Sequence, residues 1–215
     1  MVLACVASGS WKEAISFFSP RPNAQSNAWQ PYSPLTNSMN EKIAGTEIIF
    51  VGSSYTKCGF NDEEIRESLN MKSMTWGRMS ATPNAIKTTF YTALQRFPDA
   101  KIIAVEVNTS YQISDKSRPR QAKLGETDLE RLDEIEQAGR AKGVEVIFFY
   151  PPSTRSVLST SGRDILNFDD SSAYPELFEP ELRIDATHLN AKGAILFSRV
   201  FCDAIKARSE SARVQ

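Results

Sequence analysis

The 215-residue chain lacks the features that identify several common classes of protein. Its 25 Lys and Arg residues balance 26 Asp and Glu residues, so the sequence offers no basic surface, and we expect no nucleic-acid partner. No stretch reaches the roughly 18 to 20 apolar residues that a membrane span requires. The apolar segment "MVLACVA" carries no basic region, so it does not indicate where the protein is located.

Cysteine is also scarce. The three cysteines are Cys5, Cys58 and Cys202, and their odd number and wide spacing indicate neither a disulfide framework nor a zinc site. Cys58 stands beside glycine and phenylalanine, which favours packing over catalysis. A phosphate-binding loop is missing too, because no GK[ST] follows the first glycine turn. The sequence therefore predicts no metal and no cofactor.

Composition divides the chain into three parts. Residues 1–45 are rich in Pro, Ser and Asn and are expected to form an extended arm. Residues 46–208 are expected to form one domain, and residues 209–215 a C-terminal tail. With 41% hydrophobic residues, a chain of this length can bury a sizeable core as one domain.

Short apolar runs alternate with amphipathic stretches from Thr46 onward. Strands are expected in "TEIIFVGSS", "KSMTWG", "AKIIAVEVN" and "VEVIFFYPP". Helices are expected in "NDEEIRESL", "TPNAIKTTFYTALQRFP" and "ETDLERLDEIEQAGRAKG", and from about Leu189 to Arg208. This alternation predicts an α/β fold, a three-layer α/β/α sandwich around a mainly parallel sheet of about four to five strands. In such folds ligands bind at the carboxyl ends of the strands.

The only histidine, His188, lies in "DATHLN", three residues after Asp185. One interpretation is an ordinary helix N-cap, because Asp or Thr commonly precedes a run such as "LNAKGAILF". The other is a catalytic base with its orienting acid. A partner for such a base stands in "VGSSYTKCGF", where a serine after a strand has its hydroxyl at the open edge of the sheet. A serine nucleophile here would have to use His188.

Four blocks of the sequence, in their order, resemble those of the SGNH/GDSL hydrolase superfamily. They are "FVGSSYTKCGF", Gly77 after the second strand, Asn108 at the end of the third, and "DATHLNAKGAILFS". The resemblance covers about residues 46 to 207 and implies a flavodoxin-like SGNH hydrolase fold. The pattern is not a GxSxG elbow, because Thr56 stands where the second glycine would be, so an α/β-hydrolase is disfavoured.

The resemblance implies a role for each matched residue. Ser54 takes the place of the nucleophile, His188 that of the general base and Asp185 that of its orienting acid. Ser53 stands where the family commonly has Asp, and it remains the alternative nucleophile. The oxyanion hole would use the backbone N–H groups of Ser54 and Gly77.

Asn108 would complete the oxyanion hole, but the third block departs from the family's GxND. It reads "VEVNTS", with Glu106 at the Gly position and Thr109 at the Asp position. Two interpretations of Asn108 stay open. It is either an oxyanion donor or a strand-end residue that hydrogen-bonds its own loop.

The function that the resemblance implies is two-step acyl transfer. The protein would be a serine-dependent ester hydrolase or an O-acyltransferase that uses a Ser-His-Asp triad on a small-molecule or polysaccharide ester, with acetyl on a carbohydrate favoured. The bacterial branches that it resembles modify envelope or exported polysaccharides, which implies a periplasmic or extracytoplasmic location. The alternatives are an accessory binding protein with little or no catalysis, and a flavodoxin-like cofactor binder.

Overall fold

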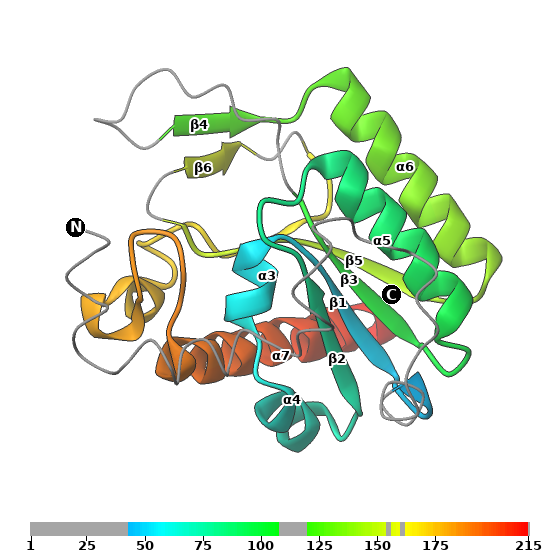
Figure 1. The fold of residues 1–215 in the computed structure, drawn as a ribbon, viewed down its shortest axis with the longest axis horizontal. Coiled ribbons are helices and arrows are strands. Elements are labelled where there is room, and N and C mark those ends of the chain that lie inside the picture. The colour runs from blue at the N-terminus through cyan, green and yellow to red at the C-terminus, as the bar shows by residue number, and fades with distance from the viewer. Residues whose placement is uncertain (1–42, 108–119, 154–155, 160–161, 215) are drawn as a thin grey trace, which may run out of the picture. The chain divides into compact units, whose positions relative to one another are not determined.

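The computed structural model describes residues 43–107, 120–153, 156–159 and 162–214 (Figure 1). The predicted arm, residues 1–45, lies outside these ranges except for its last three residues. The fold below therefore concerns the part predicted as one domain and the segment that follows it.

A parallel sheet forms the centre of this part of the chain. Its five strands are β1 (Ile48–Gly52), β2 (Ser73–Gly77), β3 (Ile102–Glu106), β5 (Glu145–Tyr150) and β7 (Leu166–Asn167). They lie in the order β2-β1-β3-β5-β7, and every pairing is parallel. Counted along the chain, this is the order 2-1-3-4-5 of a flavodoxin-like doubly wound sheet. The predicted α/β class, with a parallel sheet of four to five strands, is confirmed.

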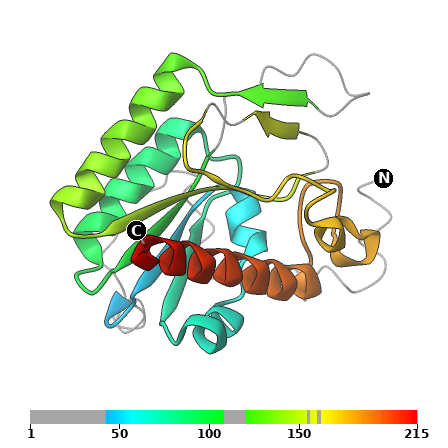
Figure 2. The same ribbon diagram turned by 180° about the vertical axis from the view of Figure 1, so that it is seen from behind.

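Helices cover both faces of the sheet, which gives three layers (Figures 1 and 2). α5 (Pro83–Arg96) and α6 (Glu126–Ala141) pack on one face, and α4 (Asp62–Leu69) and α7 (Ala191–Val214) pack on the other. Strand side chains alternate between these two cores, as a sheet buried on both sides requires. No helix in the described ranges combines the length and apolar character of a membrane span.

The core between the sheet and α7 is built from phenylalanine rings. Phe60 stacks on Phe50 with 3.9 Å between ring centroids, and Phe201 meets Phe50 and Phe149 edge-on at 5.5 and 5.4 Å. All four rings are buried. Each such ring removes a large apolar surface from water, and the edge-on geometry adds favourable quadrupole contacts. This cluster anchors α7, whose first residue follows the histidine segment.

The predicted helix ends agree with the structure where a capping residue marks them. The Asn61 side chain accepts a hydrogen bond from the Glu64 N–H at the start of α4. Thr82 caps α5 in the same way, with Pro83 as the first helical residue. Gly143, just after α6, has a φ of 69°, the left-handed conformation that glycine adopts most easily.

Three features outside the candidate site differ from the sequence-based prediction. A second parallel sheet pairs β4 (Arg120–Lys123) with β6 (Ser156–Ser159), and neither strand was predicted. Both are only four residues long, and neither sequence is an apolar run. The two-residue strand β7 was missed for the same reason. α7 begins at Ala191 and continues to Val214, past the predicted end at Arg208, so most of the predicted tail is helical.

We expect Phe201→Ala to lower the free energy of unfolding by about 3 to 5 kcal/mol, because the change removes a fully buried ring and leaves a cavity. Met79→Ala is the control, since Met79 is 59% exposed and its change should stay within about 0.5 kcal/mol. Urea unfolding followed by circular dichroism measures both. Equal stability of the two variants would contradict the importance of the phenylalanine core.

Candidate active site

Ser53 and Ser54, the two candidate nucleophiles, lie directly after β1, where a helix begins. No helix was predicted between the first strand and "NDEEIRESL", but the structure contains a short one there, α3 (Ser54–Gly59). Ser53 is the N-cap, and its hydroxyl accepts a hydrogen bond from the Tyr55 N–H at 3.2 Å. Ser54 is therefore the first helical residue, and α3 follows the carboxyl end of β1 (Figure 1).

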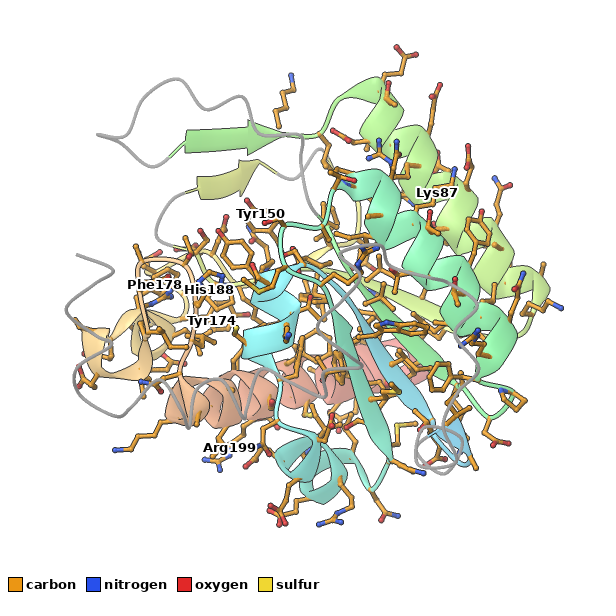
Figure 3. All side chains as sticks on the ribbon, in the orientation of Figure 1. Lys87, Tyr150, Tyr174, Phe178, His188 and Arg199 are labelled. Carbon is orange, nitrogen blue, oxygen red and sulfur yellow. The ribbon has the colours of Figure 1, made fainter. Side chains whose placement is uncertain are left out.

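Ser54, His188 and Asp185 form a continuous chain of hydrogen bonds. The His188 Nε2 lies 2.9 Å from the Ser54 Oγ, although 134 residues separate the two in sequence. The His188 Nδ1 lies 2.9 Å from Asp185 Oδ2 and 3.1 Å from Asp185 Oδ1. With the proton on Nδ1, Nε2 is an acceptor for the serine hydroxyl. Figure 3 shows His188 beside α3.

Asp185 shapes the turn that presents the histidine. Its Oδ1 accepts hydrogen bonds from the Thr187 N–H at 2.7 Å, the Thr187 hydroxyl at 2.6 Å and the His188 N–H at 2.9 Å. Partial burial works to raise the pKa of Asp185, but the hydrogen bonds from Thr187 and His188 outweigh it and lower the pKa. Asp185 is consequently an anion at neutral pH, suited to hold an imidazole in one tautomer.

The helix-cap interpretation of "DATHLN" is wrong for Asp185 and Thr187. Asn190 is the residue that caps α7, because its side-chain oxygen accepts from the N–H groups of Lys192 at 3.0 Å and Gly193 at 3.1 Å. Among the residues that the structure describes, Asp185 accepts hydrogen bonds from its own turn and from the imidazole alone.

Ser53, the alternative nucleophile, is placed differently from Ser54. It is 3% exposed, and its hydroxyl donates to Glu106 Oε1 at 2.5 Å while it accepts from the Tyr55 N–H. The histidine contacts Ser54 instead. The geometry therefore favours Ser54 as the nucleophile.

Glu106 is a residue near the site that the sequence did not assign to it. It ends β3, is 3% exposed, and accepts hydrogen bonds from both Ser53 and Thr56. Burial raises its pKa, and the hydrogen bonds from Ser53 and Thr56 oppose that shift without cancelling it. The available sequence signal was a charged residue inside the apolar run "IIAVEV", since buried carboxylates are rare without a partner.

Gly77, a predicted oxyanion residue, lies against residues 53–57, which carry the predicted nucleophile and which we call the nucleophile turn. It ends β2 and pairs with Gly52 in the register of the sheet. A Cβ at position 77 would overlap the backbone of Ser53 and Lys57, so a glycine is needed for this approach. Asn108, the predicted side-chain donor of the oxyanion hole, lies outside the described residues.

The Ser54 N–H is the remaining predicted oxyanion donor. As the first N–H of α3 it has no acceptor within the helix. Among the described residues no other acceptor binds it either. An N–H at this position points out of the helix start, where the charge of a bound oxyanion would be stabilised.

Tyr55 and Arg183 border the Ser54, His188 and Asp185 side chains. The Tyr55 ring lies 5.6 Å from the His188 ring, tilted by 32°, and so restricts the imidazole from one side. The Arg183 guanidinium donates to the Leu177 carbonyl at 2.8 Å and lies over the Phe178 ring. Burial lowers the pKa of Arg183, while its proximity to Asp185 and Tyr55 opposes the shift.

The buried thiols are poor nucleophiles. Burial raises the pKa of Cys58 to about 11 and that of Cys202 to about 12, and both side chains are at most 5% exposed. Within the described ranges, no three His, Cys, Asp or Glu side chains come together as metal ligands.

Comparison of the sequence with protein-family models gives no match, and comparison with curated proteins gives none either. The assignment of a function therefore depends on the arrangement of Ser54, His188 and Asp185, together with the order of the sequence blocks.

We expect Glu106→Gln to change how stability depends on pH. Because the pKa of Glu106 is raised above its ordinary 4.5, the folded wild type binds a proton more tightly there than the unfolded chain does. Its stability relative to Glu106→Gln should therefore fall as pH rises above 4.5, by at most about 1.4 kcal/mol per pH unit. Urea unfolding at several pH values measures this difference, and a difference that rises with pH would contradict the raised pKa.

Proposed function

We propose that the protein is a serine-dependent ester hydrolase or O-acyltransferase that forms an acyl-enzyme on Ser54. The observation that carries the proposal is the hydrogen-bonded chain from Asp185 through His188 to Ser54. A nucleophile, a base and an orienting acid in this order are what acyl transfer requires. The close approach of Gly77 to the start of α3 supports an oxyanion hole made of backbone N–H groups.

The proposed reaction has two halves. In the first, the Ser54 Oγ attacks the ester carbonyl carbon while His188 Nε2 takes the hydroxyl proton. The negative charge on the carbonyl oxygen is held by the N–H groups of Ser54 and Gly77, to which the family resemblance adds the side chain of Asn108. The tetrahedral intermediate then collapses, the alcohol leaves with the proton from His188, and the acyl group stays on Ser54.

In the second half an acceptor hydroxyl attacks the acyl-enzyme, with His188 again as the base. Water as the acceptor makes the protein an esterase, and a sugar hydroxyl makes it a transferase. The resemblance to the SGNH/GDSL superfamily supports an acetyl ester on a carbohydrate or polysaccharide as the substrate. It also supports a periplasmic or extracytoplasmic location in a bacterium.

Two alternatives share the fold but give the site less purpose. A flavodoxin-like cofactor binder fits the strand order 2-1-3-4-5, yet it has no need for an imidazole between a serine and an aspartate. An accessory protein with little catalysis is favoured by the departures at Ser53 and Glu106 from the family's blocks. The hydrogen bonds of the three catalytic side chains favour the enzyme over both.

A fluorophosphonate probe tests the proposal, because it labels serines that a neighbouring base activates. We expect one label per wild-type chain, on Ser54, and none in Ser54→Ala. The labelling rate should fall by about 10⁴- to 10⁶-fold in His188→Ala and by about 10⁴-fold in Asp185→Asn, as in other serine triads.

Cys58→Ser is the matched control for these variants. It replaces the Cys58 thiol, which lies in the same helix as Ser54 but is unreactive because its pKa is raised. This variant should therefore label at the wild-type rate. Circular dichroism confirms that each variant is folded. A folded wild-type protein that never labels would exclude the enzyme.

A further inference from the structure

The position of Glu106 on β3 places its carboxyl group directly under the nucleophile turn. β1 and β3 are parallel neighbours with Val51 opposite Val105, so the next residues, Gly52 and Glu106, lie side by side at the strand ends. A Cβ at position 52 would overlap the Glu106 carboxylate and the Thr56 hydroxyl. The glycine thus makes room for a buried carboxylate between the sheet and the first turn of α3.

Glu106 binds the residues on both sides of Ser54. Its Oε2 accepts from the Ser53 N–H at 2.8 Å and from the N–H and hydroxyl of Thr56 at 3.2 and 2.5 Å. Its Oε1 accepts from the Ser53 hydroxyl at 2.5 Å. These four donors match the acceptor capacity of one carboxylate. Among the described residues, no Lys or Arg forms an ion pair with it.

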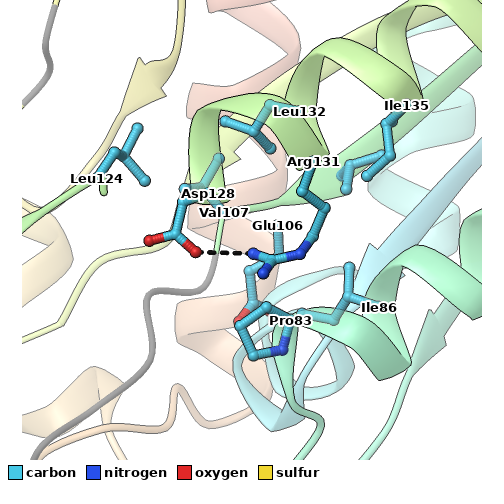
Figure 4. A pocket seen from close by; sticks show the side chains of 10 residues that line it. Pro83, Ile86, Glu106, Val107, Leu124, Asp128, Arg131, Leu132 and Ile135 are labelled. Carbon is cyan, nitrogen blue, oxygen red and sulfur yellow. Dashed lines mark hydrogen bonds and ion pairs between the residues drawn. The ribbon is translucent and has the colours of Figure 1, made fainter. Parts of the chain in front are cut away.

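In the part of the chain that the structure describes, Glu106 accepts hydrogen bonds from Ser53 and Thr56 alone. On the side of α5 and α6 it borders a cavity of about 10 Å³, at the lower limit for a single water molecule (Figure 4). The guanidinium of Arg131, which also lines that cavity, donates to Asp128 at 2.7 Å. Burying a carboxylate without hydrogen-bond donors would lower the stability of the fold. The four hydrogen bonds therefore stabilise both Glu106 and the position of the turn.

The turn needs such a support. α3 has only six residues, and a helix of that length does not persist by its own hydrogen bonds. Ser53 connects Glu106 to the start of α3, since its hydroxyl donates to Glu106 and accepts from the Tyr55 N–H. Glu106 therefore fixes the backbone on both sides of Ser54, at Ser53 and at Thr56.

We propose that Glu106 is the positioning residue of the nucleophile turn and that it replaces an aspartate at position 53. The four blocks resemble a family that commonly has Asp at position 53 and Gly at position 106, and this chain has Ser53 and Glu106 instead. The structure places these two departures in direct contact, so they amount to one exchange of a carboxylate between neighbouring strand ends. An aspartate at the N-cap could accept the Tyr55 and Thr56 N–H groups itself.

Four variants test this inference, which rests on the proposed function of Ser54. We expect Glu106→Gly to slow fluorophosphonate labelling and ester hydrolysis by about 100-fold, because small displacements of a nucleophile have effects of that size. The loss should appear in kcat, with KM little changed. Ser53→Asp alone should also be slower and less stable, because it brings a second carboxylate against Glu106.

The double variant Ser53→Asp/Glu106→Gly should label and hydrolyse at a rate within about tenfold of the wild type. It should also be more stable than either single variant. Glu106→Gln should stay in the same range, since its oxygen can take the Oε2 position and its NH₂ can donate to the Ser53 hydroxyl. Glu145→Gly is the matched control, with the same change at the opposite edge of the sheet, and it should label at the wild-type rate.

The outcomes separate the two proposals. Wild-type labelling together with a Glu106→Gly variant that labels equally fast would overturn the role of Glu106 alone. A folded double variant that is no faster than either single variant would overturn the exchange. No labelling of the folded wild type would overturn the function of Ser54, and the positioning role of Glu106 with it.

Discussion

The parallel pairing of β1 with β2 and β3 is the constraint on which the site depends. It aligns the ends of three strands at one edge, with Gly52 opposite Gly77 and Val51 opposite Val105. The nucleophile turn, the glycine beside it and the supporting carboxylate therefore lie together although they are far apart in sequence. The phenylalanine core under α7 then fixes the segment that carries His188 against the same edge.

Two carboxyl groups at this edge, one buried and one half exposed, are each held by several hydrogen bonds. Glu106 receives four hydrogen bonds from the turn above it, and Asp185 receives its own from Thr187 and His188. The two carboxyl groups have opposite pKa shifts, because Glu106 is enclosed and Asp185 is half exposed. One supports the backbone, and the other remains an anion beside the imidazole.

The sequence predicted four of the five strands of the central sheet, the capped helices and the pairing of Ser54 with His188, because each has a local signal or a unique residue. It missed β4, β6 and β7, which are short and depend on pairing partners far along the chain. It assigned no function to Glu106, because the donors of its hydrogen bonds come from another strand end. It also left Asp185 and Thr187 as possible caps, since only the geometry shows that Asn190 caps α7.

The central claim is that His188 activates Ser54 to form an acyl-enzyme, and trapping that species tests it most directly. Wild-type protein mixed with p-nitrophenyl acetate and quenched in acid should gain the mass of one acetyl group, located by peptide mass spectrometry on Ser54. His188→Ala, treated identically, should gain none. An acetyl group on Ser53 or Cys58, or equal acetylation of Ser54 in His188→Ala, would contradict the account.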